Sequence, residues 1–145
     1  MNEINISCNF VKYPINKKNL RLFCSEILGS KGYSIYTVSI IFVNKDELKR
    51  MKYKYFKKNI YTDIIAFNLN EKNEELDGEL YISYNYVKNN AKFYKTDFEK
   101  ELRRVVSHGL LHLIGYKDDT TESKLEMTNL EDFFMDFSKN KQILC

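Results

Sequence analysis

Apolar residues along the chain recur with two different spacings, which predict a mixture of strands and helices. Runs rich in β-branched and aromatic residues favour strands, and we predict them at residues 4–11, 33–43, 62–69 and 79–83. Apolar residues three and four positions apart favour amphipathic helices, predicted at residues 16–28, 84–93, 97–114 and 120–137, with another that begins after Asn44. A polar loop is expected at residues 70–78. This order predicts an α+β fold, with one mixed sheet of about four strands and helices packed around it.

Capping residues mark several of the predicted helix boundaries. Asn16 and Asn44 precede apolar periodic stretches, and an asparagine side chain can accept a hydrogen bond from the first turn of a helix. Glu47 follows Asn44 by three residues, in a pattern like a capping box. Leu48 and Met51 are expected to face the core from the helix that Asn44 begins.

The length and composition fit one domain that spans residues 1–145. The hydrophobic share is 43% and the charged share 30%, which excludes collagen-like and disordered classes. The three cysteines, Cys8, Cys24 and Cys145, lack the spacing of a metal site, and their odd number favours a reducing cytoplasm over a disulfide framework. The longest nearly apolar run, residues 35–43, is far shorter than the about 20 residues of a membrane span. We therefore expect a soluble, cytoplasmic protein with no membrane partner.

The two histidines of the chain lie four residues apart in one predicted helix. His108 and His112 would therefore stand one turn apart on the same face, a spacing that zinc sites use. Gly115 is expected to end this helix, so that the chain can turn back and bring Asp118 toward the pair. Three protein ligands leave one tetrahedral position for water, which suits a catalytic metal. The alternative is that both histidines are partly buried residues of the core.

The residue after His108 limits the chemistry that such a metal could perform. Zinc peptidases of the H-E-x-x-H type have a glutamate there as general base, whereas this chain has Gly109. Peptide hydrolysis by that route is therefore disfavoured. A reaction in which the metal acts together with a phosphate of the substrate is easier to reconcile with the motif.

Residues 45–58 carry seven cationic side chains and two acidic ones, with aromatic residues between them. Cations can follow phosphates and aromatic faces can stack on unpaired bases, so this segment favours single-stranded RNA. The alternative is a solvated helix face with ordinary core aromatics. The candidate RNA-binding residues are Lys52, Tyr53, Lys54, Tyr55, Lys57 and Lys58. The last predicted helix has the opposite bias and is expected to mark a surface turned away from RNA, through Glu122, Glu126, Glu131, Asp132 and Asp136.

Three sequence blocks resemble the YbeY family of bacterial rRNA-maturation endoribonucleases. HGLLHLIGYKDD, which begins at His108, is similar to the family signature H-G-x-L-H-L-x-G-Y-D-H. TDIIAF from Thr62 and DGELYIS from Asp77 are similar to two strand blocks of the family in the same order. The resemblance implies a sheet surrounded by helices. It also implies a zinc-dependent, single-strand-specific endoribonuclease that acts on the 3′ end of small-subunit rRNA and in ribosome quality control, with His108 and His112 as the first two zinc ligands.

The chain departs from the family pattern at several positions. Asp118 stands where most members have a third histidine, and it is a competent zinc ligand, with Asp119 as a fallback. Phe56 stands where the family has a basic residue, often arginine, in the loop before the TD block. Lys57 and Lys58 are adjacent and can replace that residue as phosphate contacts. Lys52 and Asn59 stand at positions where the family has an asparagine and an aspartate.

Together these patterns predict one zinc ion per chain, bound by His108, His112 and Asp118, that polarises a water molecule or a phosphoryl oxygen. The catalytic residues are expected to be the two histidines and Lys58, while Ser107 is expected to be structural. The predicted partners are single-stranded RNA, precursor rRNA and ribosomal proteins. Two alternatives stay open: a metal hydrolase of another substrate class, and a non-catalytic ribosome-assembly or RNA-binding factor.

Overall fold

The computed structural model describes residues 2–8, 14–70 and 75–145. Within them, strands and helices follow one another in the order β1 (Asn2–Cys8), α1 (Lys17–Ser30), β2 (Tyr36–Val43), α2 (Lys45–Phe56), β3 (Ile64–Asn68), β4 (Leu76–Ser83), α3 (Tyr84–Phe93), α4 (Phe98–Leu113) and α5 (Thr121–Phe134). The strands form one sheet in the order β1-β2-β4-β3. β1, β2 and β4 are parallel, and β3 pairs antiparallel with β4 at one edge. The predicted α+β fold with a four-stranded mixed sheet is confirmed.

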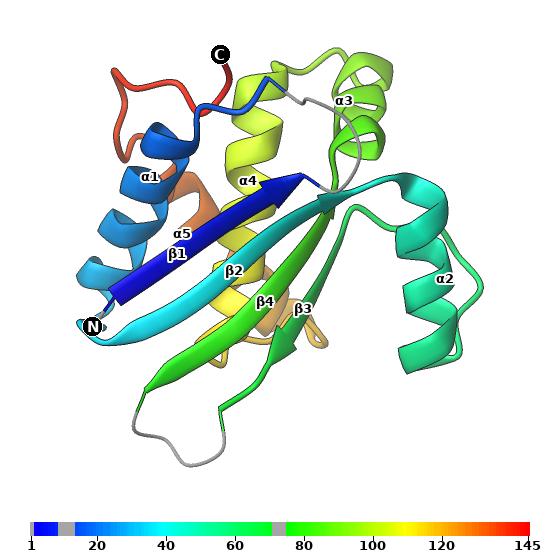
Figure 1. Cartoon of the computed structure of the whole chain (residues 1–145), viewed down its shortest axis with the longest axis horizontal. Coiled ribbons are helices and arrows are strands. Elements are labelled where there is room, and N and C mark those ends of the chain that lie inside the picture. The colour runs from blue at the N-terminus through cyan, green and yellow to red at the C-terminus, as the bar shows by residue number, and fades with distance from the viewer. Residues whose placement is uncertain (1, 9–13, 71–74) are drawn as a thin grey trace.

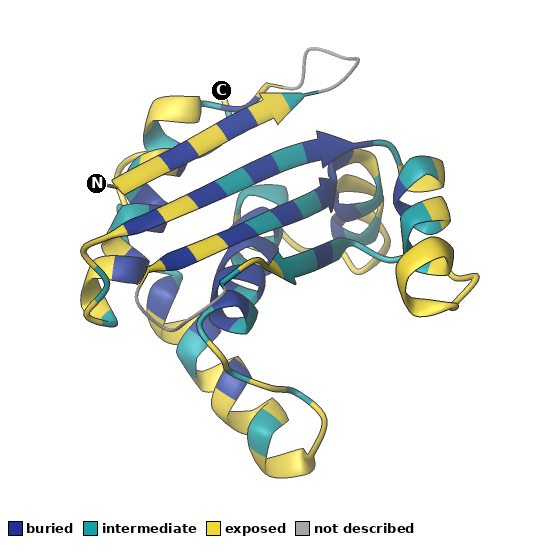
Figure 2. Ribbon diagram, turned by 60° about the horizontal axis from the view of Figure 1, so that its bottom comes forward, coloured by how far each residue is buried: buried dark blue, intermediate teal, exposed yellow. Residues whose placement is uncertain are grey.

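Helices cover the two faces of the sheet unequally. In Figure 1, α1, α4 and α5 lie behind the sheet, whereas α2 lies at the end of the sheet beyond β3. Buried and more exposed residues alternate along β2 and β4, as Figure 2 shows, because successive side chains of a strand point to opposite faces. Val38, Ile40, Leu80 and Ile82 belong to the main core, on the face that α1 and α4 cover. A smaller cluster, made of Val43, Leu48 and Ile65, attaches α2.

Most predicted helix boundaries agree with the structure. Asn16 caps α1 and Asn44 caps α2, each through a side-chain oxygen that accepts a backbone N–H three residues later. Leu48 of α2 is fully buried, and Met51 of the same helix packs beside it half-buried. The last helix ends at Phe134 and not at residue 137, because residues 135–140 form turns.

The prediction of a loop over residues 70–78 is wrong at its end, because β4 already begins at Leu76. Asp77 and Gly78 disfavour strands by propensity, but pairing with Thr37 and Val38 of β2 outweighs that preference. Gly78 is also required by packing, because a Cβ there would stand 2.6 Å from the Cδ2 atom of Leu113. The end of the predicted first strand, residues 9–11, lies outside the described residues.

A buried arginine fastens the C-terminal segment, residues 135–145, to α4. The guanidinium of Arg103 donates hydrogen bonds to the carbonyl oxygens of Met135, Phe137, Ser138 and Lys141. Its Nε atom lies 2.7 Å from the carboxylate of Glu99, which in turn accepts the backbone N–H groups of Ile143 and Leu144. The segment therefore packs as part of the body of the molecule.

None of the helices in the described part of the chain is long and apolar enough to cross a membrane.

Candidate metal centre

Helix α4 carries both histidines because its apolar face packs on the sheet. Asp97 caps the first turn of α4. The apolar side chains that pack α4 against the sheet and neighbouring helices are Leu102, Val105, Val106, Leu110 and Leu113. His108 and His112 lie beside this stripe, each about 30% exposed at the side chain. They are therefore held by a rigid, well-packed helix but remain accessible from one side.

Helix α4 ends in a tight turn that sends the chain back toward the histidines. Gly115 has a φ of 103°, a conformation that glycine adopts without the strain of a side chain. The backbone N–H of Tyr116 donates to the carbonyl of Leu111 at 3.0 Å, and that of Gly115 to His112 at 3.1 Å. This pair of bonds is a Schellman motif. The turn confirms the predicted end of the helix and places Asp118 beside both imidazoles.

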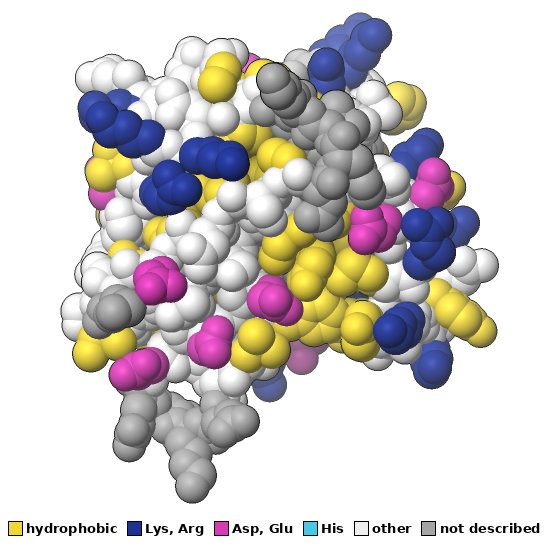
Figure 3. Space-filling view, in the orientation of Figure 1, with side chains coloured by type: hydrophobic (Ala, Val, Ile, Leu, Met, Phe, Trp, Pro, Cys, Tyr) yellow, Lys and Arg dark blue, Asp and Glu magenta, His cyan; other side chains and the backbone are white. Residues whose placement is uncertain are grey.

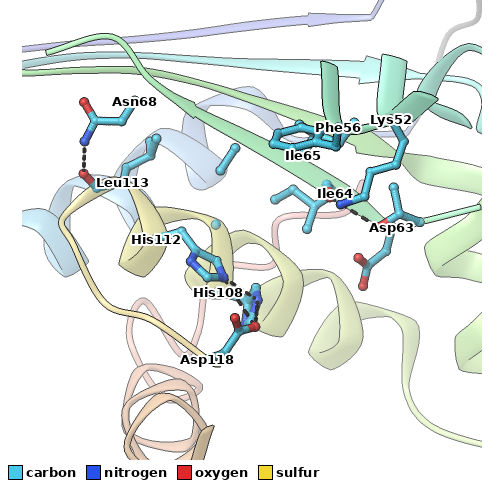
Figure 4. Close-up of a pocket in the computed structure, with 13 residues that line it drawn as sticks. Lys52, Phe56, Asp63, Ile64, Ile65, Asn68, His108, His112, Leu113 and Asp118 are labelled. Carbon is cyan, nitrogen blue, oxygen red and sulfur yellow. Dashed lines mark hydrogen bonds and ion pairs between the residues drawn. The ribbon is translucent and has the colours of Figure 1, made fainter. Parts of the chain in front are cut away.

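One side-chain atom from each of His108, His112 and Asp118 lies close to the other two, beside α4 (Figure 4). The Nε2 atoms of His108 and His112 lie 3.0 Å apart. The Oδ2 atom of Asp118 lies 3.4 Å from the first and 3.5 Å from the second. Ligands of a tetrahedral ion at about 2.0–2.1 Å would be about 3.3–3.4 Å from one another. The three atoms therefore match one triangular face around a small divalent cation, with a fourth position left toward the cavity.

Asp119, the fallback ligand, is turned toward α5 instead. Its Oδ1 atom accepts a hydrogen bond from the hydroxyl of Ser123 at 3.4 Å. Ser107, which was expected to be structural, is buried, and its hydroxyl donates to the carbonyl of Arg104 at 2.9 Å.

Glu131 supports the metal centre from behind, a role that sequence reasoning missed. Its Oε2 atom lies 2.6 Å from Nδ1 of His108, and its Oε1 atom accepts from Arg104 at 2.9 Å. An ionised carboxylate can only accept, so Nδ1 of His108 carries the proton and Nε2 is left to bind a metal. Glu131 is buried and does not belong to a solvated acidic surface. The available signal was its spacing with Met127 and Phe134 on the buried face of α5.

Burial and the neighbouring carboxylates shift the pKa of His108 in opposite directions. Burial opposes the charged imidazole, but the hydrogen bond and charge of Glu131, with the charges of Asp118 and Asp63, outweigh that effect. The pKa of His108 is therefore raised above its ordinary value. The carboxylates around this imidazole favour positive charge at the site, which a bound cation also provides.

A cavity of about 530 Å³ opens in front of the three ligand atoms. One wall is α4, with Gly109 between the histidines, and the opposite wall is β3 with the two residues before it, Thr62 and Asp63. Because β3 is an edge strand, one side of its backbone pairs with no other strand in the part of the chain that the structure describes. Asn68 fixes the far end of this wall by donating to the carbonyl of Leu113 at 2.9 Å. The cavity can therefore hold an extended substrate between a strand edge and the metal ligands.

Asp63 adds a carboxyl group to the same cavity. Burial raises its pKa most strongly, and Glu131 raises it further, while His108 and the backbone N–H groups of Asp63 and Ile64 lower it. The net direction is upward. Its carboxylate is therefore more costly to ionise than that of an exposed aspartate.

Comparison with known proteins assigns the chain to a family. A family model described as "Endoribonuclease YbeY" matches residues 5–139 of the chain. The chain belongs to the YbeY family. Proteins named Endoribonuclease YbeY from Cytophaga hutchinsonii and Karelsulcia muelleri are 36% and 37% identical to it, over 88% and 81% of this chain and 90% and 82% of theirs. A solution structure of a protein from Thermotoga maritima is similar, with a TM-score of 0.66 and 27% identity, over 95% of this chain and 90% of that one.

The cationic segment of this YbeY-family chain is divided between two places. Lys52 and Phe56 reach the metal cavity, so an aromatic ring stands where the family resemblance predicts a basic side chain. Tyr55 packs edge-on against Phe67, with ring centroids 5.1 Å apart. Lys57 ends α2 in a left-handed conformation, with a φ of 58°. Neither Lys57 nor Lys58 is among the described residues that line the metal cavity, and the roles expected for them stay predictions.

Proposed function

We propose that this chain is a zinc-dependent endoribonuclease that cleaves single-stranded RNA during rRNA maturation. The observation that carries the proposal is the triangle of ligand atoms from His108, His112 and Asp118, 3.0–3.5 Å apart and open to a cavity. Relatives named Endoribonuclease YbeY support the choice of RNA as substrate. Action at the 3′ end of small-subunit rRNA, a part in ribosome quality control, contact with ribosomal proteins and a cytoplasmic location follow from the family resemblance alone.

The donor set fits zinc by its chemistry. Two imidazole nitrogens and one carboxylate oxygen are ligands that zinc accepts, and three protein ligands are the usual number at a catalytic zinc. A zinc ion there would supply a Lewis acid that polarises a water molecule or a phosphoryl oxygen. Because Gly109 carries no carboxylate, a zinc peptidase mechanism of the H-E-x-x-H type has no general base on that turn.

The chain's own residues would hold the RNA and the ligands in place. Glu131 binds the Nδ1 side of His108, so that Nε2 is the nitrogen that faces the cavity and can bind a metal. Lys52, on the cavity wall, can neutralise a phosphate next to the scissile bond. The unpaired edge of β3 presents backbone N–H and carbonyl groups that can bind the bases or sugars of an extended strand.

The metal site is tested by elemental analysis of purified wild type beside His112→Ala and Asp118→Ala. We expect nearly one zinc per chain in the wild type and loss of the metal in both variants. Asp119→Ala is the matched control and should keep its zinc, because Asp119 faces Ser123. Full occupancy in Asp118→Ala, or no metal in a wild type given zinc, would contradict the proposed site.

The activity is tested on single-stranded RNA, on the same RNA in a duplex, and on a general peptide library. We expect cleavage of the single strand only, abolished in His112→Ala. RNA binding without cleavage by the zinc-loaded wild type would favour a binding factor, and cleavage of peptides would favour another class of hydrolase. Charge reversal at Lys57 and Lys58 should weaken RNA binding and flatten its salt dependence.

A further inference from the structure

A second hollow, of about 700 Å³, lies on the outer side of α2 and is not used by the metal centre. Its wall combines two tyrosine rings with three cations, one acid and one amide, from Asp46, Lys49, Arg50, Tyr53, Lys54, Asn59 and Tyr61. Figure 3 shows that Lys and Arg side chains gather around α2 on this side of the molecule. Two lysines and an aspartate are among the described residues that line the hollow, and these residue types are depleted at typical protein–protein interfaces.

The hollow and the metal cavity are neighbours on the same two segments. Successive residues of a helix are turned by 100°, so Tyr53 lies a little over a quarter turn from Lys52, which lines the cavity. The loop after α2 contributes to both places, with Tyr61 in the hollow and Asp63 in the cavity. An RNA strand that leaves the metal cavity past α2 would therefore reach the hollow after it crosses one face of that helix.

The cations of the hollow are not neutralised by carboxylates of the described residues. In the described parts of the chain, Lys49, Arg50 and Lys54 form no ion pair with a carboxylate. The single acid of the wall, Asp46, accepts a hydrogen bond from the Tyr61 hydroxyl at 3.0 Å. The ammonium of Lys49 rests 4.3 Å from the centroid of the Tyr61 ring. These cations are therefore available to a polyanion.

The aromatic side chains supply a stacking surface beside these cations. Tyr53 is 56% exposed and Tyr61 is 41% exposed, so both side chains present surface to solvent. An exposed flat ring next to unneutralised cations is the combination with which proteins hold single-stranded nucleic acid. An acidic peptide would satisfy the cations but would leave the exposed ring surface without a matching partner.

We propose that this hollow is a second nucleotide subsite, in which an unpaired base stacks on Tyr53 while neighbouring phosphates contact Lys49 and Arg50. The inference rests on the proposed function, because it adds a site for the same RNA strand a few nucleotides from the scissile bond. It means that the enzyme recognises an unpaired segment and not only the phosphate that it cleaves. A substrate too short to reach the hollow would bind through the metal cavity alone.

The test is equilibrium binding of two fluorescent 2′-O-methyl single-stranded oligonucleotides, about 12 and about 4 nucleotides long, to the zinc-loaded protein. Tyr53→Ala should weaken binding of the longer probe roughly tenfold and leave the shorter probe unchanged, because one stacked base is lost. Tyr53→Phe should bind both like the wild type. Lys49→Glu with Arg50→Glu should reduce the salt dependence for the longer probe. Tyr94→Ala, which removes a similarly exposed tyrosine at the end of α3, is the matched control.

The outcomes separate the two proposals. Unchanged binding of the longer probe by Tyr53→Ala, with RNA cleavage intact, would overturn the subsite and leave the proposed function standing. An equal loss in Tyr94→Ala would also overturn it, because exposed aromatic residues in general would then explain the effect. No binding of either probe by the wild type would overturn both. Stronger binding of an acidic peptide than of the longer probe would assign the hollow to a protein partner and overturn the subsite.

Discussion

At the residue scale, the two oxygens of Glu131 are shared between an imidazole and a guanidinium. One accepts from His108 and the other from Arg104, which also pairs with Asp132 at 2.6 Å. Removing this carboxylate from water costs free energy, and its contacts with the two partners offset that cost. We therefore expect Glu131 to be a positioning residue, which would act on a bound metal through the orientation and tautomer of His108.

We predict that Glu131→Ala binds zinc about 10- to 100-fold more weakly than the wild type, because His108 loses the group that orients it. The measurement is a chelator competition that gives the metal dissociation constant. Asp132→Asn is the matched control, since it removes the other carboxylate of Arg104 and leaves the imidazole bond intact. Equal zinc affinity in Glu131→Ala and the wild type would exclude the positioning role.

Asp63 gives a prediction for pH dependence. Its folded pKa is raised above the ordinary 3.8, so the folded protein binds this proton more tightly than the unfolded chain does. The charged form therefore lowers stability above the folded pKa, and this cost disappears as the pH falls below 3.8. Asp63→Asn should raise the Tm of the metal-free protein at pH 7, and the difference should shrink toward acid pH. A lower Tm at pH 7 would show that the carboxylate is stabilising.

That His108, His112 and Asp118 lie together could be predicted from the sequence because local geometry decides their positions, and their role as metal ligands stays a prediction. The helical repeat aligns His108 with His112. The turn at Gly115 then brings Asp118, six residues after His112, back toward both histidines. Glu131 meets His108 from a different helix, 23 residues later in the chain. Its position depends on how α5 packs against α4, which periodicity alone does not give. Acidic residues are mostly exposed in proteins, so the charge of Glu131 favoured an assignment to the surface and not to the buried face of the helix.

At the scale of elements, the distance between α4 and the sheet depends on Gly109, which has no side chain. A Cβ at Gly109 would stand 2.5 Å from Cδ1 of Ile64 and 2.9 Å from Cδ2 of Leu80. Glycine therefore lets the helix with the histidines approach β3 and β4 closely. The width of the metal cavity follows from this approach, since Gly109 and Ile64 line its two walls.

We predict that Gly109→Ala is destabilised by about 1–3 kcal/mol, because the added methyl overpacks the helix–sheet contact. Gly29→Ala in α1 is the matched control, since nothing lies within 4 Å of its added Cβ. That substitution should be neutral or stabilising by up to about 1 kcal/mol through helix propensity. Denaturant unfolding measures both, and equal stability of the two variants would contradict the tight contact.

The positions of the elements were easier to predict than their ends. Strand β4 begins three residues earlier than expected, because Leu76, Asp77 and Gly78 pair with β2 and local propensity cannot reveal a partner 40 residues away. The cationic segment was predicted as one RNA-binding unit, yet α2 turns its side chains toward different surroundings. Lys52 lines the metal cavity and Tyr53 the second hollow.

At the scale of the whole molecule, Arg103 joins parts of the chain that are distant in sequence. It binds the backbone of residues 135–141 and pairs with Glu99, whose carboxylate holds residues 143 and 144. Ile143 then accepts the backbone N–H of Asn16, and Leu144 forms a bridge with Ile15. The cap of α1, the start of α4 and the C-terminal segment are therefore one connected unit.

We predict that Arg103→Ala lowers the free energy of unfolding by about 3 kcal/mol or more, because buried carbonyls and the Glu99 carboxylate lose their partner. The C-terminal segment should become sensitive to limited proteolysis at the same time. Arg21→Ala is the matched control and should change little, since its Nε atom donates to one carbonyl, that of Ile4. Urea unfolding and mass spectrometry of the digest measure both effects.

The outer edge of β3 has a consequence for how the protein behaves in solution. Residues of β3 line the metal cavity, and an edge strand can also pair with a strand of another molecule. β3 is limited to five residues, and Asn68 ties its end to α4, so it offers little length for such pairing. Catalytic access and protection from self-association thus compete at one short strand. A longer β3 would present a longer unpaired edge beside the metal cavity and would favour aggregation through strand pairing.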